Sequence, residues 1–145
     1  MIRVLIVDYQ ELARRSIQAL PRRSPDMESI GEARDGREAV ELAERLEPDV
    51  ICMDIKMPHL DGLGATSQIL AHQSNARVLI VAMSYDERII SQTMKNGAKG
   101  YVAKSDMFDE LVGAIRQVQS GKPYLSAQIA HTLDESGHDL SKPEE

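Results

Sequence analysis

Five short apolar runs alternate with longer amphipathic segments, and this alternation constrains the fold more than any other feature of the sequence. Runs with the length and apolar character of strands cover residues 2–7, 50–53, 77–83 and 100–103, and residues 27–33 form a weaker strand pattern. Segments with helical spacing follow them at residues 11–20, 37–46, 62–71, 86–96 and 106–120. Five strand–helix units in a row favour right-handed crossovers. We therefore expect an α/β fold with a doubly wound, five-stranded parallel sheet and helices on both of its faces.

Single residues mark the ends and the inner faces of the expected helices. Pro21 is expected to end the first helix, Asp35 to cap the second and Gly97 to end the fourth. The helical pattern also places Leu12 in the first helix and Phe108 in the last helix on the faces that pack against the sheet. These positions predict both the helix boundaries and the side chains that fill the core.

The length and composition indicate one compact domain with a short tail. The chain has 145 residues, of which 42% are hydrophobic and only 3% are aromatic, so aliphatic side chains must fill the core. We assign residues 1–121 to the main domain, 122–136 to an additional C-terminal helix and 137–145 to a polar linker. A second domain of ordinary size does not fit in this length.

Charge and cysteine content narrow the classes of function. The formal net charge of −6 disfavours direct binding to a nucleic-acid backbone. The single cysteine, Cys52, lies in an apolar run and is interpreted as a buried thiol in a reducing compartment. The apolar start stops at Asp8, too early for a signal peptide, and no run approaches the ~20 apolar residues of a membrane span. We therefore expect a cytoplasmic location and no membrane partner.

Three charged residues come directly after expected strands, although they are far apart in the sequence. Asp8 follows the first strand, Asp54 the third and Lys104 the fifth. In an open parallel sheet, ligands bind beyond the carboxyl ends of the strands, where the strand order reverses. We therefore expect Asp8, Asp54 and Lys104 to meet in one acidic pocket that contains a single ammonium group.

The stretches around these three residues resemble the signature motifs of bacterial two-component response-regulator receivers. The matching segments are VLIVD at 4–8, MDIKMP at 53–58 and GAKGYVAK at 97–104, in the order that the family has. The resemblance covers residues 2–120 and implies the flavodoxin-like receiver fold with strand order 2-1-3-4-5. The segments GKPYLS and QIA within 121–130 are similar to the NarL/FixJ subfamily, closest to its GacA/UvrY members.

The resemblance assigns a chemical role to each residue of the expected pocket. Asp54 matches the phosphoacceptor, whose carboxylate attacks the phosphorus of a phosphohistidine donor. Lys104 matches the lysine that neutralises the phosphoryl oxygens. A Mg²⁺ ion would be held by Asp8, Asp54 and the backbone carbonyl of Lys56, because this ion prefers hard oxygen ligands. The residues by themselves also permit a simpler interpretation, in which Asp8 caps the following helix and Lys104 is a surface lysine.

The sequence departs from the family pattern at two positions of the pocket. Tyr9 replaces the second acid next to Asp8, and a neutral phenol is a poor Mg²⁺ ligand, so the metal site is expected to be weak or absent. Ala82 stands where the family has the Thr or Ser that contacts the phosphoryl group, and Ser84 is a remote substitute. Without that hydroxyl, the aromatic switch residue Tyr101 is expected to pack at the edge of the sheet.

Several functional hypotheses are compatible with the sequence. The first is a phosphoswitch that changes conformation at the face of the fourth helix, fifth strand and fifth helix. The second is a phosphorylation-independent pseudo-receiver that serves as an interaction or dimerisation module. An aspartate-nucleophile phosphatase is disfavoured, because Lys56 stands where such enzymes place a second acid. A flavodoxin-like fold without pocket chemistry would leave the Asp54 and Lys104 motifs as coincidence.

The resemblance also implies partners. A sensor histidine kinase or a phosphotransfer protein would supply the phosphoryl group, and the family forms homodimers through its fourth and fifth helices or its first and fifth. Residues 140–145 resemble the opening of a LuxR-type helix-turn-helix domain, so the chain is either part of a DNA-binding transcription regulator or a stand-alone receiver. DNA would then be contacted only through an output domain outside this chain, and the receiver is expected to be a signalling module rather than an enzyme.

Overall fold

A parallel six-stranded β-sheet forms the centre of the computed structural model, which describes residues 1–83 and 85–136. The strands are β1 (Ile2–Val7), β2 (Met27–Ala33), β3 (Val50–Met53), β4 (Arg77–Ala82), β5 (Gly100–Ala103) and β6 (Tyr124–Leu125). The helices are α1 (Glu11–Arg22), α2 (Gly36–Leu46), α3 (Gly62–His72), α4 (Glu87–Lys95), α5 (Met107–Gln119) and α6 (Ala127–Ser136), with the short 3₁₀ helix η1 (Lys104–Asp106) before α5.

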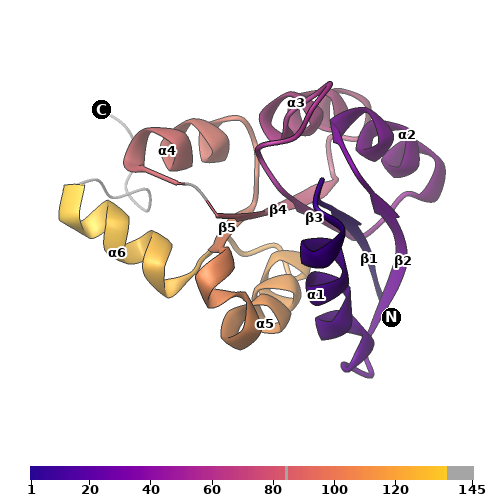
Figure 1. Ribbon diagram of the computed structural model, residues 1–145, viewed down its shortest axis with the longest axis horizontal. Helices are drawn as coiled ribbons and strands as arrows, with labels where there is room; N and C mark the ends of the chain where they lie inside the picture. Colours follow the sequence, from indigo (N-terminus) through magenta and orange to yellow (C-terminus); the bar gives the residue numbers. More distant parts are fainter. Residues whose placement is uncertain (84, 137–145) are drawn as a thin grey trace.

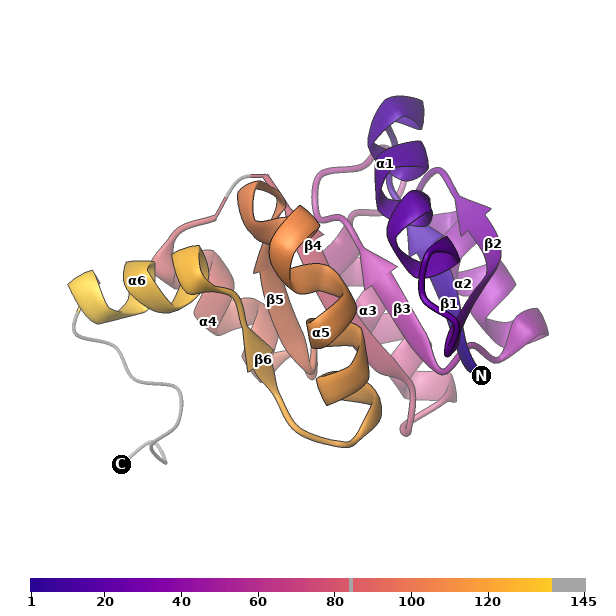
Figure 2. The same ribbon diagram turned by 90° about the horizontal axis from the view of Figure 1, so that it is seen from below.

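Helices cover both faces of the sheet. α1 and α5 lie on one face, and α2, α3 and α4 lie on the other (Figure 1 and Figure 2). Successive residues of β1 point to opposite faces, so that Val4 and Ile6 join the core under α1 and α5, whereas Leu5 and Val7 join the core under α2 and α3. The observed order is β2-β1-β3-β4-β5-β6. The expected doubly wound α/β fold and its strand order 2-1-3-4-5 are therefore confirmed.

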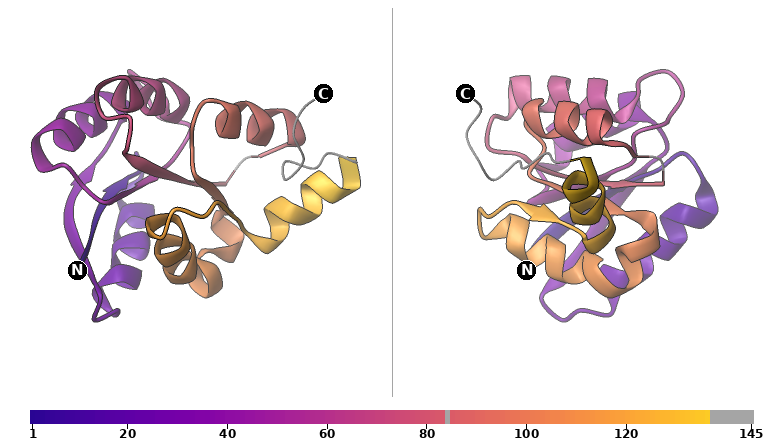
Figure 3. Two further views of the ribbon diagram at one scale, coloured as in Figure 1. Left: turned by 180° about the vertical axis from the view of Figure 1, so that it is seen from behind. Right: turned by 90° about the vertical axis from the view of Figure 1, so that its left-hand side faces the viewer.

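The C-terminal part adds a strand and a helix that the five-stranded expectation did not include. β6 runs parallel to β5, with Leu125 opposite Tyr101, because the chain turns back along the open edge of β5 and uses its backbone hydrogen-bonding groups. α6 then crosses the end of the sheet between α4 and α5 (Figure 3). Its Ile129 and Leu133 are buried in the core. Residues 122–136 therefore help to close the sheet.

Two of the three expected helix boundaries are confirmed. The side chain of Asp35 caps α2, and Gly97 adopts a left-handed φ of 110° just after α4. Pro21 does not end α1, which continues to Arg22. Proline is tolerated here because it lies in the last turn, where the amide of Ser24 still donates to the carbonyl of Pro21.

Leu12 and Phe108 do not pack against the sheet, so the prediction for these two side chains was wrong. They are 79% and 67% exposed, respectively. Both lie in the first turn of a helix that begins shortly after the carboxyl end of a strand, and neither side chain belongs to the buried clusters. The helical pattern gives the face of a helix, but it does not show where along the helix that face is covered.

The roles expected for Ser84 and for residues 137–145 lie outside the described residues. The division of the chain at residues 121 and 136 stays a prediction. Within the described ranges, no helix is both long and apolar enough to cross a bilayer.

Candidate functional site

The carboxyl ends of three strands of the sheet bring charged residues together, with β4 lying between the second and the third of these strands. Asp8 follows β1, Asp54 follows β3 and Lys104 follows β5. A 3.0 Å hydrogen bond from the amide of Asp54 to the carbonyl of Val7 continues the pairing of β1 with β3 up to the acids. The structure thus brings together the three residues that the sequence pattern placed at one edge of the sheet.

The ammonium group of Lys104 pairs unequally with the two acids. Its Nζ lies 2.7 Å from Oδ2 of Asp8 and 3.6 Å from Oδ2 of Asp54. The side chain of Asp8 is completely buried, whereas those of Asp54 and Lys104 are each 12% exposed. The more deeply buried carboxylate, that of Asp8, therefore has the closer positive charge. This closer pairing offsets the larger loss of hydration that burial imposes on Asp8.

Backbone amides orient both carboxylates. Oδ1 of Asp8 accepts a hydrogen bond from the amide of Gln10, and Oδ1 of Asp54 accepts one from the amide of Ile55, both at 2.9 Å. One oxygen of each acid is fixed in this way. The other oxygen, Oδ2, faces the shared ammonium group of Lys104.

A buried arginine, Arg14, fixes the turn that carries Asp8. One nitrogen of its guanidinium group donates to the backbone carbonyls of Asp8 at 2.9 Å and of Tyr9 at 3.0 Å, and its Nε lies 3.5 Å from the carboxylate of Glu32. Arg14 was missed from the sequence. A signal was present, because Arg14 lies one helical turn before the apolar Ile17 and therefore falls on the buried face of α1.

The electrostatic environment changes the acidity of Asp54. Burial and, to a lesser extent, the negative charge of Asp8 raise the pKa of its carboxyl group, Lys104 partly opposes both effects, and the resulting pKa is about 6. The carboxylate is thus mostly ionised at neutral pH. Its raised pKa also makes it more basic than an ordinary aspartate, which favours reaction with an electrophile.

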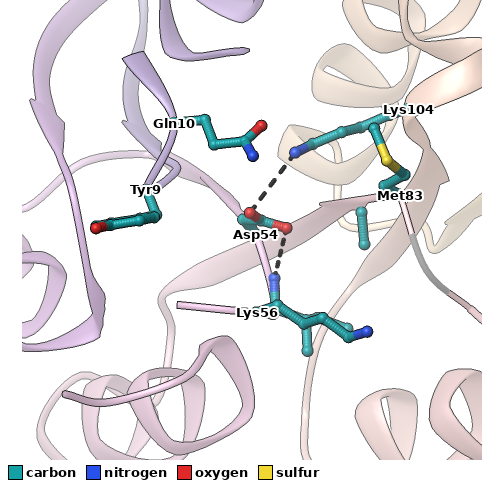
Figure 4. Close-up of a pocket in the computed structure, with 8 residues that line it drawn as sticks. Tyr9, Gln10, Asp54, Lys56, Met83 and Lys104 are labelled. Carbon is teal, nitrogen blue, oxygen red and sulfur yellow. Dashed lines mark hydrogen bonds and ion pairs between the residues drawn. The ribbon is translucent and has the colours of Figure 1, made fainter. Parts of the chain in front are cut away.

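A pocket of about 160 Å³ opens beside Asp54 (Figure 4). It is lined by Tyr9, Gln10, Asp54, Ile55, Lys56, Ala82, Met83 and Lys104. The ammonium group of Lys104 points toward Asp54, whereas the Tyr9 ring and the Lys56 side chain point away from its carboxylate (Figure 4). This volume is large enough for a small anion together with several water molecules. The sequence did not single out Gln10 and Met83 as lining residues.

The expected switch positions have different environments. Ala82 lies at the end of β4, opposite Ala103 of β5, and lines the pocket without offering a hydroxyl group. Tyr101 is completely buried. Its strand is flanked by β6, so the expected position at the edge of the sheet was wrong. Burial raises the pKa of the Tyr101 phenol, which therefore stays neutral in the core.

The donor groups of the pocket fit a Mg²⁺ ion held by few protein ligands. Mg²⁺ is commonly bound by one or two carboxylates, with water completing its octahedral shell. Oδ2 of Asp8 is buried, accepts no hydrogen bond within the described residues and faces only the ammonium group of Lys104. In the same ranges, no cluster of three or more His, Cys, Asp or Glu side chains that could hold a metal is found. Asp8 and Asp54 therefore supply the minimum for this ion and no more.

The fold and the acid–acid–lysine arrangement at its carboxyl edge define a receiver of two-component signalling. The family model described as "Response regulator receiver domain" matches residues 4–116. The chain therefore belongs to the response-regulator receiver domain family.

The relatives narrow this class. The response regulator GacA of Pseudomonas aeruginosa is 38% identical over 133 residues, which cover 92% of this chain and 62% of GacA. The transcriptional regulatory protein LiaR of Bacillus subtilis is 38% identical over 130 residues, which cover 90% of this chain and 62% of LiaR. These relatives and the nitrate/nitrite response regulator NarL of Escherichia coli place the chain among receivers of the NarL type.

The solved structures agree with this placement. A two-component response regulator of the LuxR family from Aurantimonas sp. SI85-9A1 has a TM-score of 0.89 and 32% identity, with 93% of this chain and 96% of that chain covered. The receiver domain of the NarL regulator from Mycobacterium tuberculosis has a TM-score of 0.80 and 29% identity, with 83% and 98% covered. The chain spans about three fifths of the length of the first curated relatives, at 62% of GacA and of LiaR.

Proposed function

We propose that the chain is a phosphate-accepting receiver in which Asp54 forms the aspartyl phosphate. The observation that carries this proposal is the placement of a nucleophilic carboxylate and a lysine ammonium, 3.6 Å apart, beside a pocket of about 160 Å³. Asp8 is completely buried and already paired at 2.7 Å, so it is not accessible to a phosphoryl donor. Asp54 is the acid that lines the pocket.

The reaction follows from the two oxygens of Asp54. Oδ1 is held by the amide of Ile55, which leaves Oδ2 as the nucleophile. As the bond from Oδ2 to phosphorus forms, the N–P bond of a phosphohistidine breaks and its electron pair returns to the imidazole nitrogen. The ammonium group of Lys104 balances the charge of the transferred phosphoryl oxygens, and Asp8 keeps that lysine in place.

A bound Mg²⁺ ion would be held by Asp8 and Asp54 and would supply a second cation, besides Lys104, to neutralise the phosphoryl oxygens. The sequence-based expectation of a backbone ligand from Lys56 belongs to the same proposal. Tyr9 adds no carboxylate to these metal ligands, so the Mg²⁺ affinity should be lower than that of a site with three acids.

Intact-mass measurement after incubation with a small acyl phosphate and Mg²⁺ tests the proposed acceptor. The wild-type chain should gain about 80 Da, whereas Asp54→Asn should gain none. Asp109→Asn is a matched control, because it removes an exposed aspartate on α5 that does not line the pocket and should gain the same mass as wild type. A wild-type chain that never gains this mass would instead support a phosphorylation-independent pseudo-receiver.

The proposed partners follow from the site and the relatives. A sensor histidine kinase or a phosphotransfer protein supplies the phosphohistidine, and the whole protein regulates transcription through a DNA-binding output domain. The name of the transcriptional regulatory protein LiaR and the additional length of LiaR and GacA support this output. We also propose that phosphorylation promotes a homodimer, because two copies position two output domains on paired DNA half-sites. Light scattering before and after phosphorylation tests the dimer.

A further inference from the structure

Helix α6 is fastened to the short segment that begins with Lys104. The amide of Ala103, immediately before this lysine, donates to Oγ of the buried Ser126 at 3.0 Å. Oδ2 of Asp106, two residues after the lysine, accepts a hydrogen bond from the amide of Gln128 at 2.9 Å. The residues on both sides of Lys104 therefore hold the start of α6.

Glu110 of α5 provides a second anchor for α6. Its carboxylate accepts the hydroxyl of Tyr124 at 2.6 Å and the amide of Ala127 at 3.1 and 3.2 Å. The first amides of a helix have no partner within the helix itself, and negative charge at this end is favourable. Because the first turn of α6 uses acids from η1 and α5 instead of its own sequence, its stability depends on where η1 lies.

The inner face of α6 covers an apolar part of the domain. Ile129 is 0% exposed and Leu133 is 3% exposed, and they belong to the same buried cluster as Ile90 of α4 and Tyr101 of β5. α6 contacts β5, α4 and η1, and Figure 3 shows it across the end of the sheet. A change in the position of α6 would thus expose apolar surface of the domain.

We propose that a change of charge in the pocket shifts helix α6, and that η1 transmits this shift from Lys104 to the start of α6. This inference rests on the proposed function, because the natural change of charge is phosphorylation of Asp54. An acyl phosphate carries about two negative charges and would draw the Lys104 ammonium away from Asp8, its partner at 2.7 Å. The largely buried side chain of Lys104 has little freedom, so its backbone and the rest of η1 move with it.

This route differs from the one that the family pattern implies. Ala82 has no hydroxyl group to follow the phosphoryl group, and Tyr101 is already completely buried. The connection through Lys104, Asp106 and α6 needs neither a hydroxyl at position 82 nor a moving ring. It loosens the first turn of α6 by weakening two backbone hydrogen bonds, one to Ser126 and one to Asp106.

A cysteine placed under α6 provides the test. In Leu133→Cys, the thiol is covered while α6 is seated, and its reaction with a maleimide is read by intact mass, which also shows whether Asp54 carries phosphate. Cys52 is buried in the core on the other face of the sheet and reports global unfolding in the same molecule. Glu135→Cys is the matched control, because residue 135 is exposed on the same helix.

The labelling rate of Leu133→Cys is expected to rise about tenfold in the phosphorylated fraction, and by a similar factor in the Lys104→Met background. This factor corresponds to an opening of α6 made easier by the loss of one charge-assisted hydrogen bond. Asp106→Asn should by itself raise the labelling rate of Leu133→Cys. It should also abolish most of the additional increase that phosphorylation or Lys104→Met causes. The Glu135→Cys rate should change less than about twofold, within the range of surface effects, and Cys52 should stay unlabelled.

The two proposals fail in different ways. If the chain never gains the phosphoryl mass, the assignment of Asp54 fails, and the Lys104→Met arm still decides whether the pocket controls α6. If phosphorylated chains and Lys104→Met chains both label at the wild-type rate, the coupling to α6 is wrong, whatever the fate of the acceptor.

Discussion

Lys104 lies closer to Asp8, at 2.7 Å, than to Asp54, at 3.6 Å. The acid proposed to react is therefore the less neutralised of the two. Because the energy of an ion pair falls with distance, the resting lysine is held mainly by Asp8. Asp8 is then both the group that positions the lysine and a competitor of the phosphoryl group for it.

The pH dependence of stability should reveal the unusual carboxyl group of Asp54. Burial raises its pKa to about 6 in the folded chain, above about 3.9 in an unfolded chain. Between these values the folded state binds more protons, so the contribution of Asp54 to stability is present at about pH 4 and is lost as the pH rises through about 6. The loss should be about 1–2 kcal/mol after allowance for partial solvent screening.

Urea unfolding at several pH values measures this effect as the difference between wild type and Asp54→Asn. Using the difference removes the contributions of all other carboxyl groups, such as Asp26, whose pKa is lowered by its hydrogen bond with Arg116. A difference that stays constant between pH 4 and 7 would contradict the raised pKa.

Restoring an acid next to Asp8 should strengthen metal binding. Tyr9→Asp adds a third carboxylate to a site that offers only Asp8 and Asp54, and Mg²⁺ affinity should rise about tenfold, or about 1.4 kcal/mol. Isothermal titration calorimetry measures the affinity. Leu12→Asp is the control, because it adds the same charge at a side chain that is 79% exposed, one turn further along. Equal gains in both variants would indicate a general charge effect instead of a ligand.

Removing the guanidinium group of Arg14 should destabilise the domain. Arg14→Met leaves the buried carbonyls of Asp8 and Tyr9 without their donor, which should cost about 2–3 kcal/mol in the free energy of unfolding. Arg15→Met is the matched control, because Arg15 is 74% exposed and pairs with the exposed Glu11; its cost should stay below about 0.5 kcal/mol. Similar values from chemical denaturation of the two variants would refute a special role for Arg14.

The exposed apolar side chains of Leu12 and Phe108 should contribute little to folding. Leu12→Ser and Phe108→Ser are expected to change the free energy of unfolding by no more than about 0.5 kcal/mol, because both side chains are mostly in water. Leu111→Ser, three residues after Phe108 on α5 and 0% exposed, should cost more than about 3 kcal/mol. A large loss in either exposed variant would show that the side chain is covered in solution.

Much of the fold was predictable because its signals are local. Four of the five expected strands are apolar runs, the second is a weaker pattern, and each is followed by a segment with helical spacing, so the doubly wound architecture follows from the pattern. The convergence of Asp8, Asp54 and Lys104 follows from their places at strand ends. β6 was not predictable in this way, because Tyr124 and Leu125 form a strand of two residues that depends on the open edge of β5.

Other features depend on tertiary geometry that no local pattern contains. The distances from Nζ of Lys104 to Asp8 and to Asp54 differ by less than one ångström, and side-chain orientation decides which acid is the closer partner. The use of Asp106 and Glu110 to hold α6 joins residues about twenty positions apart. Leu12 and Phe108 have the right spacing for the core and still lie in solvent, both in the first turn of their helix.

The irregular pairing of β1 with β2 bears on how this domain avoids self-association. β6 is too short to serve as a template, so β2 is the one long strand with an open side among the described residues. Its register with β1 shifts between Val4 and Leu5, and it carries the exposed Glu28 and Glu32. A distorted, acidic border is a poor surface for the strand of another molecule. Replacing these glutamates with apolar residues would remove part of that protection and expose the sheet to fibril-like growth from one side.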